Sequence, residues 1–422
     1  MTEKTDNTAH PVARTHIVSP AGNVDKLKFA VDYGADEVYF GGDEFNLRMK
    51  AGNFSFEDIE ESLDYCGSHG VNAVFLLNSF LHQGDIETAE RFIAEIRRFR
   101  FDAIMVSDPG MMLLIREAGI DTDLHLSTQM STLNHLSLKF WHNAGFSRIV
   151  MGRETTLEEI RRIREMTDIE IEVFAHGALC IAYSGRCLLS RYLTGRDANQ
   201  GDCSHACRWN YSLVEKKRPG NELDIIEYSE GGSRRGGGGT EILSSKDLCL
   251  ISRVPEYIEA GVNAFKIEGR MKSLYHAANT TRIYRHAVEL AGTPGFDKNL
   301  PFWLEELDLI NHRPYTEDLF NEFDSIGFTD IPYIQKALFL GCRESGDTPL
   351  REVEVRIFNP VYRGETIDAI FPIKGEIRDG LFMVEEIRDS SGAAVDMARP
   401  GQTCSIRFDR EVHERAIFRR RQ

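Results

Sequence analysis

The sequence predicts an α/β protein: a (β/α)8 TIM-like barrel followed by a C-terminal small all-β domain. Two observations lead to this prediction. From residue 16, short apolar runs alternate with amphipathic helical segments. After about residue 345, the pattern changes to alternating strands separated by Gly and Asp turns. Eight strand candidates that alternate with single helices favour a closed barrel over an open α/β sheet, which is the alternative fold.

The elements of the barrel follow in order along the chain. The strand candidates are His16–Ser19, Glu37–Phe40, Ala73–Leu77, Ala103–Ser107, Leu124–Ser127, Arg148–Met151, Ile171–Ala175 and Ala264–Glu268. Helical patterns between them include Val24–Tyr33, Phe56–Ser68, Ile86–Arg98 and Thr132–Asn143. Expected N-caps are Asn23, Ser55 and Thr156. Expected C-caps are Gly34, Gly70, Gly119, Gly145 and Gly261.

The predicted organisation has three parts. Residues 1–15 form a disordered N-terminal tail, residues 16–340 the barrel, and residues 345–415 the small β domain. Helical segments are expected to continue from the barrel to about Ala337. The barrel contains a cysteine-rich segment at 176–211 and a flexible Gly-rich insertion at 228–240. The strands expected in the β domain are Val353–Phe358, Thr366–Phe371, Leu381–Ile387 and Thr403–Phe408.

Composition and charge narrow the class of protein. The 422 residues carry a formal net charge of −16, which argues against non-specific coating of nucleic acid because neutralising phosphates requires clustered Lys and Arg. No apolar run approaches the roughly 20 residues of a membrane span, and Met1–Arg14 lacks the apolar core of a signal peptide. We therefore expect a cytoplasmic protein without a membrane partner. Four basic clusters are interpreted as solvated faces or tails: Arg97–Arg100, Arg161–Arg164, Lys216–Arg218 and Arg419–Arg421.

Half of the eight cysteines lie in one short segment, as Cys180, Cys187, Cys203 and Cys207. In a reducing cytosol, clustered thiols more often bind metal than form disulfides. Their C-x6-C-x15-C-x3-C spacing lacks the paired C-x2-C of a zinc ribbon. An iron–sulfur cluster is therefore favoured, then zinc, then four unligated thiols. The segment follows the seventh strand, so it is expected over the C-terminal mouth of the barrel, where chemistry collects in such folds.

Polar residues at the strand ends form the candidate site. His176 is a candidate acid–base group or ligand. The guanidinium group of arginine is suited to binding a carboxylate or a phosphate, so the basic residues at the strand ends predict an anion-binding site at the mouth. The alternative is that these residues only form ion pairs that stabilise the structure. The candidate catalytic residues are His176, Glu268 and Arg270, and the candidate substrate-binding residues are Asn78, Gln129, Arg153, Arg186 and Lys272.

Several long motifs resemble the collagenase-like peptidase family U32. They are Glu172–Ser190, Tyr192–Cys203, Cys207–Trp209, Ser245–Leu248 and Lys266–Ser273, with shorter matches at Ser19–Asn23, Tyr33–Asp36, Val106–Gly110 and His125–Gln129. The similarity is strong over about residues 16–290 and continues into the β domain. Length and layout are most similar to the branch of the family that produces 5-hydroxyuridine in tRNA.

The resemblance implies a barrel that hydroxylates RNA without molecular oxygen. The implied target is the wobble uridine at tRNA position 34, with prephenate, a small dicarboxylate, as co-substrate. By motif match, the ligands of a 4Fe–4S cluster would be Cys180, Cys187, Cys203 and Cys207.

Three other interpretations stay open. Relatives within the family hydroxylate a cytidine of large-subunit rRNA. A collagenase-like peptidase would need an activated nucleophile or a metal-bound water, and the motifs offer neither clearly. A non-catalytic tRNA-binding protein would use the β domain as its binding module, and the net charge of −16 counts against it.

Overall fold

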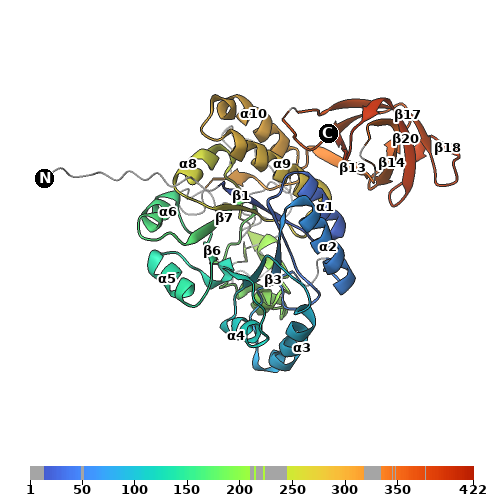
Figure 1. Cartoon of the computed structure of the whole chain (residues 1–422). Coiled ribbons are helices and arrows are strands. Elements are labelled where there is room, and N and C mark those ends of the chain that lie inside the picture. The colour runs from blue at the N-terminus through green and yellow to red at the C-terminus, as the bar shows by residue number, and fades with distance from the viewer. Residues whose placement is uncertain are drawn as a thin grey trace.

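The computed structural model describes residues 14–48, 52–209, 213–214, 222–223, 245–317, 334–344, 346, 348–375 and 377–422. It contains a barrel and, beside it, a smaller β domain (Figure 1). Residues 1–13 of the expected tail, the basic cluster Lys216–Arg218 and the Gly-rich insertion 228–240 lie outside the described residues. Within the expected tail, Thr15 is described and is buried.

Eight parallel strands close into a barrel, which confirms the predicted fold. They are β1 (His16–Pro20), β2 (Glu37–Phe40), β3 (Asn72–Leu77), β4 (Ala103–Val106), β5 (Asp123–Leu126), β6 (Arg148–Val150), β7 (Glu170–Ala178) and β11 (Ala264–Ile267). Each strand from β1 to β7 pairs with the next, and β11 pairs with both β1 and β7. This last pairing closes the ring and rules out an open sheet.

Helices alternate with the strands and cover the outside of the barrel (Figure 1). They are α1 (Val24–Asp32), α2 (Phe56–His69), α3 (Ile86–Ile96), α4 (Pro109–Glu117), α5 (His135–Asn143), α6 (Leu157–Arg164), α8 (Val254–Glu259), α9 (Leu274–Leu290) and α10 (Pro294–Asp308). The three expected N-caps accept the predicted backbone bonds, and the five expected C-cap glycines all have positive φ. Among the described helices, none has the length and apolar character needed to cross a bilayer.

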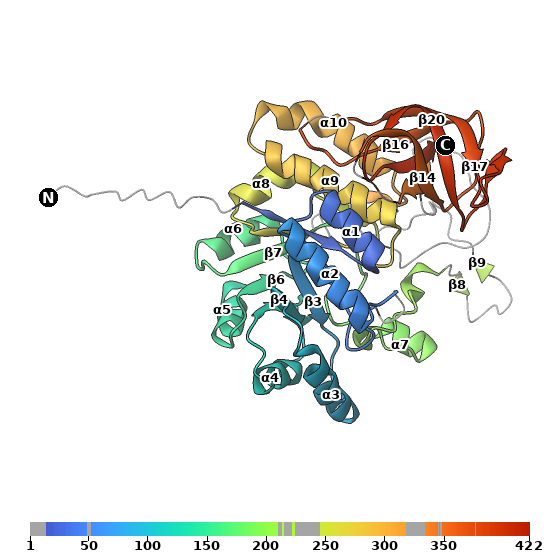
Figure 2. The ribbon, with the colours of Figure 1, turned by 45° about the vertical axis from the view of Figure 1, so that its right-hand side comes forward.

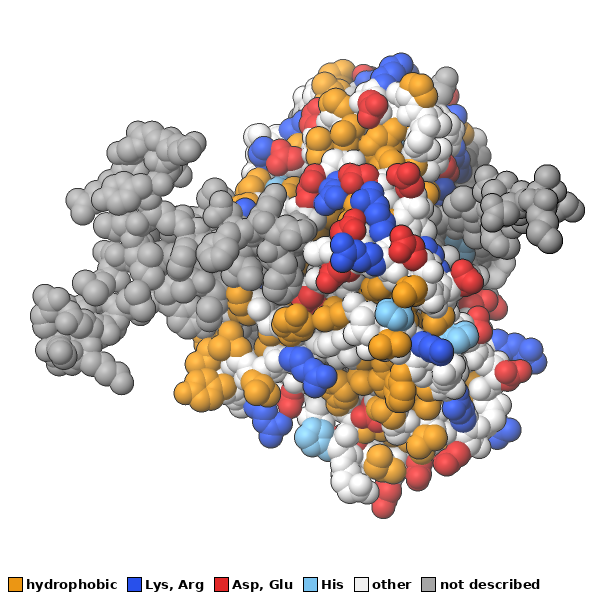
Figure 3. Space-filling model, turned by 90° about the vertical axis from the view of Figure 1, so that its left-hand side faces the viewer, with side chains coloured by type: hydrophobic (Ala, Val, Ile, Leu, Met, Phe, Trp, Pro, Cys, Tyr) orange, Lys and Arg blue, Asp and Glu red, His pale blue; other side chains and the backbone are white. Residues whose placement is uncertain are grey.

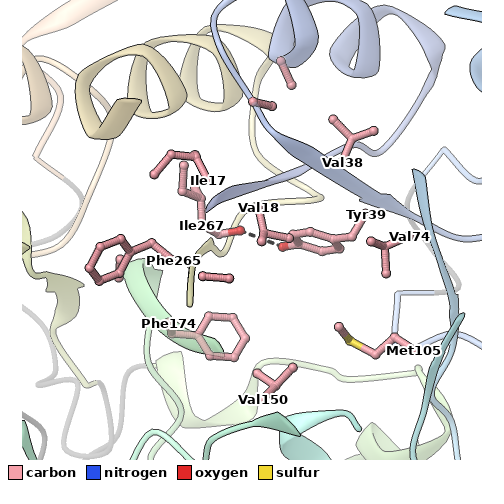
Figure 4. Close-up of a cluster of buried hydrophobic side chains, with 14 of the residues drawn as sticks. Ile17, Val18, Val38, Tyr39, Val74, Met105, Val150, Phe174, Phe265 and Ile267 are labelled. Atoms are coloured by element: carbon pink, nitrogen blue, oxygen red, sulfur yellow. Dashed lines mark hydrogen bonds between the residues drawn. The ribbon is translucent and has the colours of Figure 1, made fainter. Parts of the chain in front are cut away.

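Side chains fill the inside of the barrel. Figure 4 shows Tyr39, Val74, Met105 and Phe174 pointing toward one another from different strands. The Tyr39 hydroxyl donates a hydrogen bond to the Ile267 carbonyl at 2.8 Å, drawn as a dashed line in Figure 4. The interior of the barrel is therefore a packed core, and any site must lie at one of its ends.

Charged groups are also buried inside the barrel. Arg148 Nη1 lies 2.8 Å from both carboxylate oxygens of Glu37, and Lys266 Nζ lies 2.7 Å from Glu172 Oε1. Burial opposes the ionisation of Glu37, but its bonds to His16 and Arg148 lower its pKa to about 2. Arg148 and Lys266 therefore each have a carboxylate partner, which offsets the cost of burying their charges.

The end of β7 departs from a regular barrel strand. A β-bulge shifts its register against β11, so that Lys266 pairs with Phe174 but Ile267 pairs with His176. Two short strands extend the sheet from there: β10 (Asp247–Cys249) pairs antiparallel with the end of β7, and β12 (Tyr315–Thr316) pairs with β10. The prediction that helical segments run to about Ala337 is wrong at β12, because a long-range pairing with β10 forms this strand.

The C-terminal part is an antiparallel β domain, as predicted. Its main strands are β13 (Ala337–Arg343), β14 (Leu350–Ile357), β16 (Thr366–Ile370), β17 (Gly380–Arg388), β20 (Thr403–Val412) and β21 (Ile417–Arg421). The domain also contains the short strands β15 (Val361–Tyr362), β18 (Ala394–Val395) and β19 (Met397–Ala398). Outside the domain, β8 (Leu213–Val214) and β9 (Glu222–Leu223) pair with each other. The pairing of β16 with β17 closes the main strands into a second barrel. The domain extends beyond the expected 345–415 at both ends, because β13 pairs with β21.

A buried ion network joins the β domain to α9 and α10, which lie next to it in Figure 2. Glu306 accepts hydrogen bonds from Arg282 at 2.7 Å and from Arg419 at 2.6 and 2.8 Å. Arg282 also pairs with Asp379, and Arg419 pairs with Asp368. The interpretation of Arg419–Arg421 as a solvated tail is therefore wrong at Arg419, which is fully buried. Removing one buried charge from such a network leaves the others uncompensated.

Candidate active site at the barrel mouth

A carboxylate surrounded by arginines lies at the C-terminal end of the barrel. Glu268 directly follows β11, and Arg48 lies in the loop after β2, with Nη2 placed 3.2 Å from Glu268 Oε1. Burial opposes the ionisation of Glu268, but the positive charges of Arg48, Arg153 and Arg270 lower its pKa overall. Because these three guanidinium groups outnumber the carboxylate, the mouth is suited to an anionic ligand.

Arg270 is a buried cation that is held by neutral groups. Only 2% of it is exposed, and its two terminal nitrogens donate to Asn46 Oδ1 at 3.0 Å and to Asn53 Oδ1 at 2.9 Å. Its Nε has no partner among the described residues. Burial, together with the nearby Arg48 charge, lowers the pKa of Arg270 to about 10. Burying a positive charge without a negative partner costs free energy. The Arg270 charge would therefore stabilise an anion that binds nearby.

Arg153 connects the mouth to the cysteine-rich segment. Its guanidinium lies over the Phe174 ring, 4.1 Å from the ring centre, at the top of the packed interior. Its Nη1 lies 3.7 Å from Cys180 Sγ. Arg153 therefore stands between Glu268, whose pKa its charge lowers, and the first of the four thiols.

The cysteine-rich segment spans the mouth and is attached to the ends of two strands. After β6, the Glu154 carboxylate accepts hydrogen bonds from Ser184 N at 2.8 Å and Ser184 Oγ at 3.0 Å. After β3, the Phe80 amide donates to the Asn199 carbonyl at 3.3 Å. Gly185 packs against the backbone at Gln129, where a Cβ would lie 1.9 Å from the carbonyl oxygen. The segment therefore forms a roof over the site, at the place that the sequence predicts.

Three of the four candidate cysteine ligands have partly buried side chains and Cys180 is exposed, and all four are free thiols. Asn199 Nδ2 donates to the Cys187 carbonyl at 3.0 Å, and Arg196 Nη2 donates to the Cys203 carbonyl at 3.0 Å, which folds the segment on itself. Burial raises the pKa of the Cys207 thiol, and the nearby Cys180 and Cys203 thiols act in the same direction. Four thiols on one segment provide a complete donor set for an iron–sulfur cluster. In the part of the chain that the structure describes, however, no three His, Cys, Asp or Glu side chains form a ready-made metal site.

The structure brings some of the other candidate residues to the mouth and leaves others at its edge. Asn78 is buried there, accepting from Leu47 N at 3.3 Å and donating to Ser127 Oγ at 3.4 Å. Gln129 lies under the roof, next to Gly185. Arg186 is exposed on the roof itself. Lys272 lies farther out, where Nζ donates to the Asn311 carbonyl at 3.2 Å.

His176 does not join the group at the mouth. The bulge in β7 gives it the same orientation as Ile267, and its ring packs against His276 and Tyr284 of α9. Only 2% of it is exposed, and burial holds its pKa well below the ordinary value for histidine. At neutral pH it is a neutral core histidine whose ring faces α9, while its backbone carbonyl accepts a hydrogen bond from the Glu268 amide at 2.8 Å.

Arg48 is the site residue that sequence reasoning missed. It lies eight residues beyond the end of β2, too far along the loop for the strand pattern to assign it to the mouth. The available signal was an arginine in the loop that follows the C-terminal end of a barrel strand.

A comparison with protein families matches residues 22–326 to the model described as "Peptidase family U32". The chain belongs to this family. It is 33% identical over 420 residues to "tRNA hydroxylation protein P1" of Bacillus subtilis (strain 168), covering 96% of this chain and 95% of that protein. It is 33% identical over 431 residues to "tRNA hydroxylation protein P" of Escherichia coli (strain K12), covering 93% of each.

A third relative of this U32 protein acts on another RNA. The "23S rRNA 5-hydroxycytidine C2501 synthase" of Escherichia coli (strain K12) is 37% identical over 373 residues, covering 86% of this chain and 53% of that protein. The family predicted from the motifs is thus confirmed, and its named relatives include RNA-hydroxylating proteins.

Proposed function

We propose that the chain is an RNA hydroxylase that converts the wobble uridine 34 of tRNA to 5-hydroxyuridine without molecular oxygen. The observation that carries the proposal is the full-length similarity to two tRNA hydroxylation proteins. The arginine-lined mouth under a cysteine-rich roof supports it, because it offers an anion site next to a donor set for a redox cluster.

The co-substrate of the proposed reaction is prephenate. Its two carboxylates match the guanidinium groups of Arg48, Arg153 and Arg270, of which the last is buried without a carboxylate partner among the described residues. Replacing Arg153 with Gln should weaken prephenate binding by roughly 10- to 100-fold, since a hydrogen bond to a charged group contributes about 1.5–3 kcal/mol. Isothermal titration calorimetry measures this effect. The control Arg161→Gln, an exposed arginine of α6, should bind prephenate like the wild type.

The cofactor of the proposed enzyme is a 4Fe–4S cluster held by Cys180, Cys187, Cys203 and Cys207. Such a cluster supplies electron transfer or a Lewis-acidic iron when bound. Because a metal site is rarely preformed without its metal, the four thiols would be drawn together as the cluster binds. Protein purified anaerobically should contain about four iron and four sulfide per chain, and Cys203→Ser should lower both. Colourless protein loaded with zinc would refute the cluster.

The test of the function is the nucleoside content of RNA from a deletion strain. Loss of 5-hydroxyuridine and its derivatives from tRNA, measured by mass spectrometry and restored by the wild-type gene, supports the proposal. Loss of 5-hydroxycytidine from 23S rRNA instead would favour the activity for which the third relative is named. If both nucleosides stay at wild-type levels, the proposal is wrong. Proteolysis by purified protein that one Cys→Ala variant abolishes would then favour a peptidase with a nucleophilic thiol.

A further inference from the structure

The short helix α7 (Leu189–Thr194) in the roof has an inverted pattern of burial. A surface helix normally buries its apolar side chains and exposes its polar ones. Here Ser190 is buried, where its Oγ lies 3.0 Å from Ser204 Oγ, while Leu188 is 71% and Tyr192 is 85% exposed. The Tyr192 amide donates to the Leu188 carbonyl at 2.9 Å, so these two exposed residues lie one turn apart on the same side.

The segment around α7 has the opposite charge to the whole chain. Residues 180–209 contain four arginines and two aspartates, a net charge of +2, whereas the complete chain carries −16. Arg191 lies on the helix next to Tyr192, and its Nη1 pairs with Asp197 Oδ2 at 2.7 Å. Arg186 is exposed nearby in the same segment. A polyanion would therefore be attracted to this part of the surface.

In the described part of the chain, the outer face of the barrel lacks the excess of positive charge that this segment carries. Figure 3 shows the face that carries α5, α6 and α8, where basic and acidic side chains lie side by side. On α6, Arg161 and Arg162 are exposed and both pair with Glu158. The interpretation of Arg161–Arg164 as a solvated face is wrong at Arg164, which is partly buried and donates to the Gly261 carbonyl and to Asn263 Oδ1 at 2.8 Å. Phe140 of α5, one of the helices outside the barrel, is 64% exposed.

We infer that the exposed side of α7, formed by Leu188, Arg191, Tyr192 and Leu193, is a stacking platform for unpaired bases of the RNA next to the target uridine. This inference rests on the proposed function. Single-stranded RNA is bound by exposed aromatic rings for the bases and arginines for the backbone. α7 offers both on the roof of the mouth, so bases bound there flank a nucleotide that enters the site. The local positive charge favours RNA over an apolar protein partner as the occupant.

The experiment measures the binding of a labelled anticodon stem-loop RNA to the full-length protein. Tyr192→Ala should weaken binding by roughly 5- to 100-fold, because one base–aromatic stack contributes that much, while Tyr192→Phe should bind like the wild type. Arg186→Gln should reduce the slope of log K against log salt by about 0.7. The matched control is Phe140→Ala, which removes another exposed aromatic ring, 64% exposed, and should leave binding unchanged.

Three outcomes would overturn the inference. Unchanged RNA binding by Tyr192→Ala would show that α7 does not touch the bases. Equal weakening by Phe140→Ala would show a non-specific effect of surface rings. A Tyr192→Leu variant that binds RNA normally would show that the apolar surface alone matters. Failure of the inference differs from failure of the proposed function, because in the first case the deletion strain still loses 5-hydroxyuridine and in the second it does not.

Discussion

The attachment of the roof depends on one carboxylate, so Glu154→Gln should loosen the cysteine-rich segment. Glu154 is 8% exposed, and its Oε1 accepts from Ser184 N at 2.8 Å, while Ser184 Oγ lies 3.0 and 3.2 Å from its two oxygens. Hydrogen bonds to a charged group contribute about 1.5–3 kcal/mol, compared with about 1 kcal/mol for neutral pairs. Glutamine retains one carbonyl oxygen but no charge. Each of the two bonds from Ser184 should therefore weaken by about 0.5–2 kcal/mol, and we expect the closed state of the segment to lose about 1.5–3 kcal/mol in total.

Hydrogen exchange measures this loss directly, because the Ser184 amide is the donor. Each 1.4 kcal/mol corresponds to a factor of about ten, so the amides of residues 179–190 should exchange about 10- to 100-fold faster in Glu154→Gln than in the wild type. Glu159→Gln is a matched control, because Glu159 accepts from the amide and hydroxyl of Thr156 at 2.8 and 2.9 Å in the capping box of α6. It is exposed and should leave residues 179–190 unchanged.

An exchange rate within about twofold of the wild type in Glu154→Gln would refute this reasoning. It would show that other contacts, such as the packing of Gly185 on Gln129, hold the segment in place. Anaerobic purification of the same variant adds a second measurement. Because the loosened segment carries the proposed cluster ligands Cys180 and Cys187, the iron content of the purified variant should fall below that of the wild type.

Two further predictions concern the buried charges. Glu306→Gln should lower the free energy of unfolding, measured in urea, by about 3–5 kcal/mol, because Arg282 and Arg419 lose their shared carboxylate. The control is Glu305→Gln: this neighbouring side chain is 59% exposed, and its substitution should change the free energy of unfolding by less than about 0.5 kcal/mol. Glu37 has a folded-state pKa of about 2, below its ordinary 4.5, so its contribution is present above pH 4.5 and is lost as the pH falls toward 2. The wild type should lose about 3 kcal/mol more than Glu37→Gln across that window, and equal losses would contradict the pKa.

Local patterns in the sequence were sufficient to predict the barrel. The eight strands and the helix caps depend on residues that are neighbours in the chain, so their apolar runs and capping side chains could be recognised directly. The position of the cysteine segment followed from the strand order, because the C-terminal ends of all the barrel strands meet at one mouth. Glu268 and Arg153 were found for the same reason.

Long-range contacts decided the rest. The pairing of Arg48 with Glu268 joins residues that are 220 positions apart, and no local pattern indicates it. The strands β10 and β12 exist because each pairs with a distant segment. Arg419 belongs to a terminal run of three arginines that suggests a solvated tail, but it is buried because β21 places it against Glu306.

The sequence by itself determined the fold class and the family, because both depend on residue types and their spacing along the chain. It also predicts a donor set of four cysteines, and this stays a prediction. The tertiary structure decided which of the candidate residues share a site. One bulge in β7 turns His176 away from the mouth toward α9, because an extra residue in a strand reverses the side chains that follow it. The same chain folds Arg48 toward Glu268 and leaves Tyr192 exposed on the roof, since burial and charge compensation depend on contacts that only the folded chain contains.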